Sequence, residues 1–185
     1  RRAVCEIETV RRSMRTEGNE LPDARGGIAG TEDEDEEYAA EGPALVSSLQ
    51  LDDNVRFLGF QKISELLPKV GVVVLSSISE ALPLVLLEGF AAGVPAVSTD
   101  VGSCRQLIEG LDDEDRALGR AGEVVGIANP EALGRAVAGL LQDPQRWQAA
   151  QQAGIRRAEA YYTQERMFGS YRALYQSLLT PGEAR

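Results

Sequence analysis

The stretch from Val72 to Gly102 constrains the fold of this chain more than any other part of the sequence. It opens with the continuous apolar run Val72–Leu75, which is typical of a strand buried on both faces. After a polar loop, the apolar residues Leu84–Ala92 predict a helix. Pro83 stands where the first turn of this helix should begin, a position at which its missing N–H removes no hydrogen bond. Pro95–Thr99 then predicts a second short strand. This order of strand, loop, helix and strand is the building block of a parallel sheet.

Two carboxylates, Glu80 and Glu88, interrupt this apolar unit. Glu80 lies beyond the end of the first strand, which is where open α/β sheets bind ligands. Glu88 lies inside the helix, where an unpaired charge is costly to bury. Together the two acceptors can hold the hydroxyls of one sugar or polyol. Alternatively, Glu88 reaches solvent and Glu80 is an ordinary loop acid, and the residues alone leave both interpretations open.

Composition excludes several classes of function. The chain has 185 residues, of which 43% are hydrophobic, enough for one sizeable core or for one domain with a tail. Its formal net charge of -10 argues against nucleic acid or an anionic membrane surface as a partner. No apolar run is long enough for a membrane span and we find no signal peptide, so we expect a cytoplasmic protein. The chain begins with Arg1 rather than Met, and we expect it to be part of a longer protein.

The chemistry available is narrow because the chain contains no histidine. A Ser-His-Asp or Cys-His nucleophile system within this chain is therefore excluded, as are zinc sites that need imidazole. Cys5 and Cys104 are too few for a disulfide framework or a metal site, and we expect two reduced thiols and no bound metal. The acidic run Glu32–Glu37 can attract cations, but such a run is far more often a solvated loop that favours a helix start.

Strand and helix patterns alternate along the chain. We expect residues 1–20 to form an N-terminal helix at the truncated start of a domain, residues 21–142 a Rossmann-like domain, and residues 143–185 a helical C-terminal segment. The predicted fold class is α/β, with a parallel sheet and helices on both faces, as in half of a doubly wound fold. Gly110–Gly122 is expected to be a charged surface loop. The aromatic side chains between Tyr161 and Tyr175 are expected to form a packing surface.

Two helix starts are indicated by capping residues. Asn129 precedes Pro130 and Asp143 precedes Pro144, so that each pair combines an N-cap side chain with a proline at the first helical position. The second start opens a segment, Gln145–Leu179, that is predicted to be almost wholly helical.

The region around the two carboxylates resembles a known family. Ser79–Pro83 leads to Glu88, and Gly89–Pro95 follows, in a pattern similar to the E-x7-E region of the GT4 family of retaining glycosyltransferases. The sequence agrees with this family on both sides as well, over Asn54–Gly59 and Ala128–Leu133. Within the family, the sequence is closest to the PelF group, the glycosyltransferases of Pel exopolysaccharide synthesis.

The resemblance covers nearly all of residues 21–179 and implies a two-domain GT-B fold whose C-terminal half binds a nucleotide sugar. This chain looks like that half, so UDP-glucose or a related UDP-sugar is implied as the donor substrate, with no cofactor. In the family, the residue that matches Glu80 contacts the transferred sugar in catalysis, and the residue that matches Glu88 holds the ribose. Further donor-binding residues implied by the resemblance are Ser79, Leu82, Pro83, Leu84, Val85, Gly59, Phe60 and Gln61.

The same resemblance implies a polysaccharide acceptor, an N-terminal GT-B domain that binds it, and membrane-bound Pel synthesis proteins as partners. The sequence departs from the family in three ways. The acceptor-binding N-terminal domain is absent from the 185 residues. The family's Arg and Lys, which neutralise the departing diphosphate, follow a strand expected before residue 1, and nothing within Arg1–Arg15 supplies them. Gly27 stands where a large aromatic residue is expected, which is predicted to weaken the packing of its strand. We therefore expect a glycosyltransferase as the parent protein and this chain as its catalytically incomplete, donor-binding part.

Two alternatives stay open at this point. The chain can be a non-catalytic nucleotide-sugar-binding or scaffold domain, which predicts donor binding without transfer even when the missing half is supplied. It can also belong to another GT-B enzyme, such as a sugar-nucleotide epimerase, whose catalytic groups would lie on the missing domain.

Overall fold

A computed structural model describes residues 25–29 and 36–179 of the chain. The helix predicted within residues 1–20 lies outside the described residues, and so do Cys5 and the basic residues of Arg1–Arg15. Most of the acidic run at residues 32–37 lies outside them as well. The described part holds every residue that the sequence predicts for the donor site.

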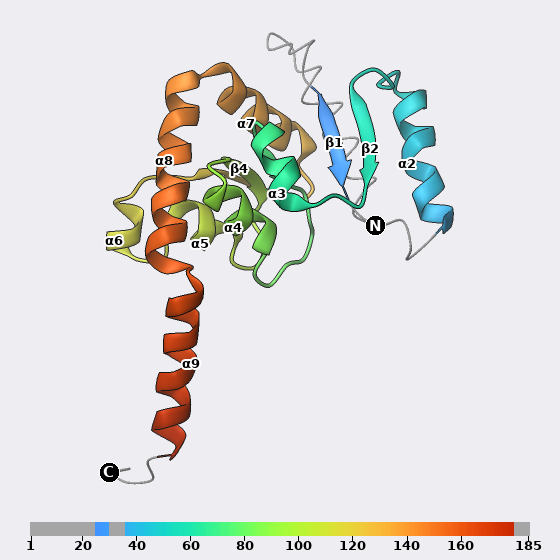
Figure 1. Ribbon diagram of the computed structural model, residues 1–185. Coiled ribbons are helices and arrows are strands. Elements are labelled where there is room, and N and C mark those ends of the chain that lie inside the picture. The colour runs from blue at the N-terminus through green and yellow to red at the C-terminus, as the bar shows by residue number, and fades with distance from the viewer. Residues whose placement is uncertain (1–24, 30–35, 180–185) are drawn as a thin grey trace.

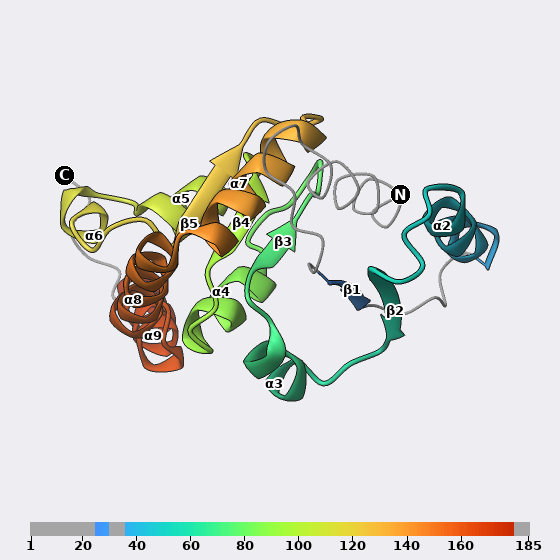
Figure 2. The ribbon, with the colours of Figure 1, turned by 90° about the horizontal axis from the view of Figure 1, so that it is seen from above.

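All strand pairings in the described part of the chain are parallel, as the sequence predicts. β1 (Gly26–Ala29) pairs with β2 (Val55–Gly59) in a two-stranded sheet. β3 (Val73–Leu75), β4 (Ala96–Thr99) and β5 (Gly122–Val125) form a three-stranded sheet with β4 in the centre. Figure 2 shows the two sheets next to each other, with β1 nearer than β2 to β3.

The strands alternate with helices along the chain. The helices are α2 (Glu36–Ser48), α3 (Ile63–Leu66), the 3-10 helix η1 (Leu67–Lys69), α4 (Leu84–Ala91), α5 (Cys104–Glu109), α6 (Asp113–Arg116), α7 (Pro130–Gln142), α8 (Pro144–Tyr161) and α9 (Gln164–Leu179). Within residues 25–29 and 36–179, every helix is too short or too polar to cross a membrane.

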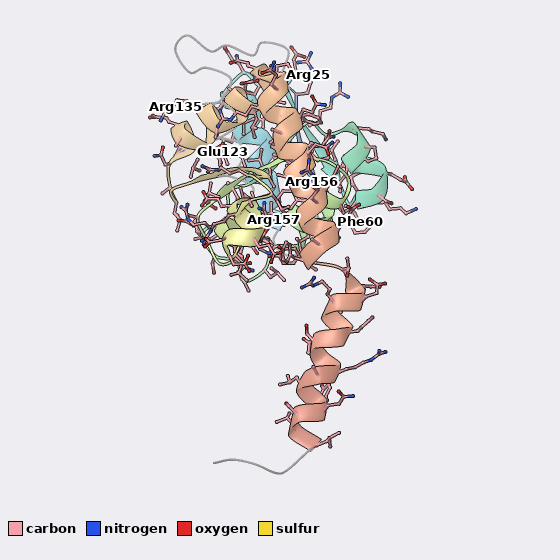
Figure 3. All side chains as sticks on the ribbon, turned by 90° about the vertical axis from the view of Figure 1, so that its left-hand side faces the viewer. Arg25, Phe60, Glu123, Arg135, Arg156 and Arg157 are labelled. Carbon is pink, nitrogen blue, oxygen red and sulfur yellow. The ribbon has the colours of Figure 1, made fainter. Side chains whose placement is uncertain are left out.

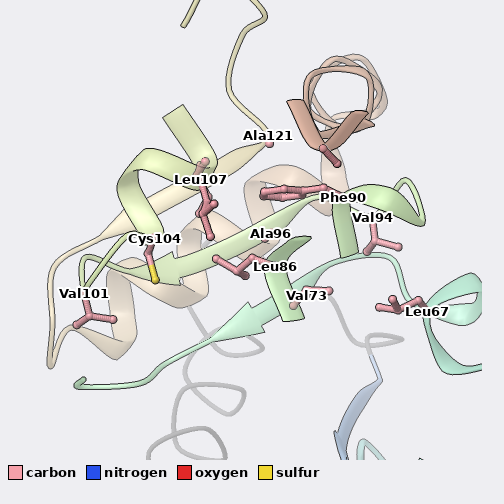
Figure 4. Packing of buried hydrophobic residues seen from close by; sticks show 12 residues of the cluster. Leu67, Val73, Leu86, Phe90, Val94, Ala96, Val101, Cys104, Leu107 and Ala121 are labelled. Atoms are coloured by element: carbon pink, nitrogen blue, oxygen red, sulfur yellow. The ribbon is translucent and has the colours of Figure 1, made fainter. Parts of the chain in front are cut away.

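Helices cover both faces of the three-stranded sheet. On one face, Ala96 of β4 packs in a cluster with Leu86 and Phe90 of α4 (Figure 4). On the other face, Val97 packs in a second cluster with Leu133 of α7. Successive residues of a strand point to opposite faces, so β4 contributes to both clusters. Each large apolar side chain that is fully buried in this way stabilises the fold by about 1.5–3 kcal/mol.

The two helix starts indicated by capping residues are confirmed. The Asn129 side chain accepts a hydrogen bond from Ala132 N at 3.0 Å. Asp143 accepts from Gln145 N and Arg146 N at 3.0 Å each. In both helices a proline follows the cap, where its missing N–H removes no bond from the helix.

Residues 110–122 differ from the predicted surface loop, because they contain the short helix α6 with a buried aspartate. Asp115 is 1% exposed and pairs with Arg157 of α8, which is 0% exposed. Arg157 Nε donates to Asp115 Oδ1 at 2.5 Å. Its other nitrogens donate to the carbonyls of Ile108 and Gly119, each at 2.8 Å. The local sequence did not reveal this site because the neutralising charge lies 42 residues further along the chain.

The C-terminal segment is almost wholly helical, as the sequence predicts, and consists of the two helices α8 and α9. Tyr162, between α8 and α9, is half-buried against the core, and Gln106 donates a hydrogen bond to its hydroxyl at 3.1 Å. On α9, by contrast, no described side chain is buried. The packing predicted for Phe168, Tyr171 and Tyr175 is therefore not found within the described part of the chain. Figure 1 shows α9 extending away from the rest of the fold.

Gly27 in β1 faces Leu58 of β2. A Cβ atom at this glycine would lie 2.9 Å from Leu58 Cδ1, so the leucine already fills the space beside it. A large aromatic residue at position 27 would require Leu58 to move.

Arg157→Met should lower the free energy of unfolding by about 3–5 kcal/mol, because it leaves the buried Asp115 carboxylate without its charged partner. The measurement is urea denaturation of the 185-residue chain, followed by circular dichroism. Arg156→Met is the matched control, since Arg156 is the exposed neighbour on the same helix (Figure 3). Its effect should stay within about 0.5 kcal/mol. Equal losses in both variants would show that the buried pair does not stabilise the fold.

Candidate functional site

Glu80 lies in the loop between β3 and α4, beyond the carboxyl end of β3. Open α/β sheets bind ligands at this edge. The Glu80 side chain is half-buried, and Ser77 Oγ donates a hydrogen bond to Glu80 Oε1 at 2.7 Å. Ser79, directly before Glu80, is exposed. The carboxylate is thus held by a residue of its own loop.

The loop that follows β4 holds the Glu80 loop in place. Thr99 Oγ1 donates to the Ser77 carbonyl at 2.5 Å. Ser103 donates twice to the Ala81 carbonyl, from its backbone N at 3.0 Å and from its Oγ at 2.8 Å. The Glu80 loop is therefore fixed on both sides of Glu80, at Ser77 and at Ala81.

Gly102 allows the two loops to approach each other. Its φ is +50°, and a Cβ atom there would lie 2.2 Å from the Glu80 carbonyl oxygen. A side chain at this position would clash with the backbone of the Glu80 loop and would also strain its own backbone. Glycine is therefore required at the point of closest contact.

α4 begins directly after the Glu80 loop. Pro83 is its N-cap and is buried with a φ of -74°, and its side chain accepts no hydrogen bond from the first turn. The first turn contains Leu84 and Val85. Backbone N–H groups at a helix start, together with the helix dipole, favour an anion near this end.

Glu88 is exposed on α4 and shares a helix face with Leu84, four residues earlier. Leu86 and Phe90, which point into the core, anchor the other face. Leu84 is 62% exposed and Leu82 is 47% exposed, so large apolar side chains border the two carboxylates. A solvated acid and an acid that receives a ligand would both be exposed in this way.

Of the remaining predicted residues, Gly59 is the last residue of β2, and Phe60 and Gln61 follow it. They lie at the carboxyl end of a strand of the two-stranded sheet, whereas Glu80 lies beyond a strand of the three-stranded sheet. Gly59 has a φ of +59°, and Gln61 Nε2 donates to the Leu58 carbonyl at 2.5 Å, so the chain turns sharply here. Phe60 is 80% exposed.

Sequence reasoning missed the residues that hold the Glu80 loop. The spacing of Ser77 three residues before Glu80 is a local signal, because serine hydroxyls commonly bond to groups a few residues away. Thr99 and Ser103 have no such signal, since each lies 22 residues from its partner along the chain.

Two other chemically important groups lie near this unit, and Arg105 is ion-paired while Cys104 is buried. Arg105 contacts Asp100 at 2.7 Å and Glu109 at 3.0 Å, and these carboxylates raise its pKa above the ordinary value. Burial raises the pKa of the Cys104 thiol, which therefore stays protonated at neutral pH. In the part of the chain that the structure describes, no group of three or more His, Cys, Asp or Glu side chains is placed to hold a metal ion.

Comparison with known proteins identifies the family. The model of the family described as Glycosyl transferases group 1 matches residues 7–157 of the chain. N-acetyl-alpha-D-glucosaminyl L-malate synthase of Bacillus anthracis is 33% identical over 139 residues, which is 73% of this chain and 34% of that protein. The chain thus spans about a third of the length of this curated relative.

Solved structures are similar over most of the chain. Anabaena HepE, in complex with UDP and glucose, has a TM-score of 0.77 and 18% sequence identity, over 93% of this chain and 44% of that one. The C-terminal domain of a group 1 glycosyl transferase family protein, LpcC of Francisella tularensis, has a TM-score of 0.70 and 21% identity, over 86% of this chain and 78% of that one.

These similarities establish the fold class predicted from the sequence. The described residues form the Rossmann-like parallel α/β fold of the C-terminal domains of GT-B glycosyltransferases, followed by a helical C-terminal segment. The family model covers most of the chain, including every predicted residue of the candidate site. The chain belongs to the group 1 glycosyltransferase family.

Proposed function

We propose that this chain is the donor-binding part of a retaining, GT4-type glycosyltransferase that takes its sugar from UDP-glucose or a related UDP-sugar. Group 1 glycosyltransferases act on nucleotide sugars, and the family match includes both carboxylates of the site. The observation that carries the proposal is the arrangement of these carboxylates. Glu80 is held at the carboxyl end of β3, and Glu88 is exposed on the helix that starts from the same loop. Two acceptors anchored in this way suit the hydroxyls of a hexose and a ribose.

Each part of the donor has its own contacts in this proposal. The transferred sugar binds Glu80, and the ribose binds Glu88. The diphosphate lies at the start of α4, where the backbone N–H groups of Leu82, Leu84 and Val85 approach it. A buried Pro83 with no capping side chain supports this placement, because it leaves the helix start to an anion.

The nucleotide base lies against the turn after β2. Gly59 permits the turn through its positive φ, and the ring of Phe60 is 80% exposed, which suits stacking on a flat base. Gln61 holds this turn through its bond to the Leu58 carbonyl. The choice of UDP-glucose comes from the sequence resemblance to the PelF group. Anabaena HepE, which was solved with UDP and glucose, has the same fold.

In the reaction, the bond between the anomeric carbon and the diphosphate oxygen breaks, and the leaving oxygen keeps the electron pair. The acceptor hydroxyl forms the new bond on the same face of the sugar and gives its proton to the departing diphosphate oxygen. This chain contributes orientation through Glu80 and stabilises the developing charge on the diphosphate through the α4 N-terminus. We propose that transfer also needs the family's basic pair and an acceptor-binding N-terminal domain, so that this chain binds the donor but does not transfer alone.

We further propose a polysaccharide as acceptor, and action in the cytoplasm beside membrane-bound proteins of Pel-type exopolysaccharide synthesis. The support is the PelF-like sequence of the site region, SSISEALPLVLLEGFAAGVPAVSTDVGSCRQLIEG. A group 1 glycosyltransferase with this acceptor would add hexose units to a growing chain.

The exposed face of α9 supports a contact with the rest of the parent protein. Large apolar residues recur along one side of this helix: Met167, Phe168, Tyr171, Leu174, Tyr175 and Leu178 are each between 46% and 70% exposed. An isolated helix of this length is marginally stable in water, so such a face favours burial against a partner. The chain spans 44% of HepE, and we propose that the part of the parent protein outside this chain covers the face.

Glu88→Ala should weaken the binding of both UDP and UDP-glucose about ten- to a hundredfold, because it removes charge-assisted bonds to the ribose worth about 1.5–3 kcal/mol. Glu80→Ala should weaken UDP-glucose and leave UDP unchanged, because UDP carries no hexose. Isothermal titration of the folded 185-residue chain measures both.

Glu159→Ala is the matched control for this titration, since Glu159 is an exposed carboxylate on α8, away from the loop. Undiminished UDP binding by Glu88→Ala would remove the ribose assignment. Donor binding without transfer by the full-length parent protein would favour the non-catalytic alternative.

Leu174→Ser combined with Leu178→Ser should lower the melting temperature of the full-length parent by about 5–10 °C, because two buried leucines would be lost from the contact. In the 185-residue chain, where both leucines are exposed, the melting temperature should stay the same. Ala173→Ser with Gln176→Ser, on the opposite side of α9, controls for helix propensity. An unchanged melting temperature of the full-length parent would show that the rest of the parent protein does not cover this face of α9.

A further inference from the structure

The position of Glu80 depends on a short chain of buried hydroxyl groups. Ser77 is 3% exposed and donates to Glu80 Oε1 at 2.7 Å. Thr99 is 4% exposed and donates to the Ser77 carbonyl at 2.5 Å. Both side chains are buried, so a ligand at the surface of the loop does not contact them.

We propose that Ser77 is a positioning residue that aims the Glu80 carboxylate at the transferred sugar, with Thr99 supporting it from β4. This inference rests on the proposed function, since it requires that Glu80 binds the sugar of the donor. Ser77 itself touches no substrate. It acts only through Glu80.

The backbone around Glu80 is held on both sides, and the bond from Ser77 acts on its side chain. Thr99 holds the loop at Ser77, and Ser103 holds it at Ala81 with two hydrogen bonds. The backbone of Gly102, in the loop after β4, lies close to the Glu80 carbonyl. A glutamate on a rigid backbone still rotates about its side-chain bonds, and fixing it costs conformational entropy. The Ser77 hydroxyl restricts this rotation before the donor arrives.

The chemistry of the bond suits this role. A hydroxyl that donates to a carboxylate makes a charge-assisted hydrogen bond, which is stronger than a bond between neutral groups. A carboxylate has more lone pairs than this one bond uses, so it can accept further bonds from sugar hydroxyls. Preorganisation of an acceptor in its binding geometry raises affinity for the group that it receives. The expected effect is therefore confined to the hexose of the donor.

A purely structural role for Ser77 makes a different prediction. If its bond only stabilised the loop, its loss would disturb α4 and Glu88 as well, and UDP and UDP-glucose would weaken together. The ratio of the two dissociation constants separates these cases, because only Glu80 is assigned to the hexose.

The experiment titrates UDP and UDP-glucose into the 185-residue chain and into its variants. Ser77→Ala should weaken the binding of UDP-glucose about tenfold, whereas the dissociation constant of UDP should change less than about twofold. Ser77→Thr keeps the hydroxyl and should restore UDP-glucose binding. Thr99→Val, which removes the supporting hydroxyl at nearly constant volume, should shift the ratio in the same direction by a smaller factor.

Ser76→Ala is the matched control. Ser76 is the preceding residue and is 8% exposed, and its Oγ has no hydrogen-bond partner within the described part of the chain. Its removal should leave both affinities unchanged. In a Glu80→Ala background, Ser77→Ala should add nothing further, because the group that it positions is gone.

The outcomes separate this inference from the proposed function. If Glu80→Ala changes the ratio of the dissociation constants of UDP-glucose and UDP but Ser77→Ala does not, the inference about Ser77 is overturned and the proposed function stands. A ratio changed by neither would overturn the assignment of the hexose to Glu80, and the inference with it. Failure of the unsubstituted, folded chain to bind UDP would overturn the donor-binding function of the chain. Equal weakening of UDP and UDP-glucose by Ser77→Ala would show a structural role and no positioning.

Discussion

The buried ion pair of Asp115 and Arg157 is the interaction on which the three-stranded half of the fold depends. Two charges taken out of water are tolerated here because the Arg157 guanidinium also bonds to the carbonyls of Ile108 and Gly119. The pair thus ties α8 to the segments around α6. α8 in turn packs on α4, where a Cβ atom at Gly154 would lie 3.1 Å from the Phe90 ring. α4, which carries Glu88, is thus linked to the ion pair through α8.

The candidate site is built from two loops that are joined by hydrogen bonds. The loop after β3 carries Glu80, and the loop after β4 supplies the donors that hold it, Thr99 and Ser103. Parallel strands bring these loops to the same edge of the sheet, which is why this edge serves as a binding site in open α/β folds. Because group 1 glycosyltransferases act on nucleotide sugars, we propose this edge as the donor site of the chain.

Two features of the described residues are usually covered by other parts of a protein: unpaired strand edges and an exposed apolar helix face. In the described residues, β1 and β3 each pair with a strand on one side only, and Figure 2 places them on neighbouring edges. α9 carries an apolar face with no buried side chain. Both features agree with a chain that spans less than half of HepE.

The sequence by itself determined what depends on near neighbours. Some signals act within a few residues of the chain: the apolar run before Glu80, Pro83 at the start of α4, and the caps at Asn129 and Asp143. These local patterns predicted the elements, and with them the positions of the two carboxylates on a loop and on a helix. The tertiary structure alone decided which groups meet across the fold. Asp115 is buried although the sequence predicts a surface loop there, and Ser103 contacts Ala81, which lies 22 residues away along the chain. Such contacts depend on how elements pack, and packing follows from the whole set of side chains rather than from any local period.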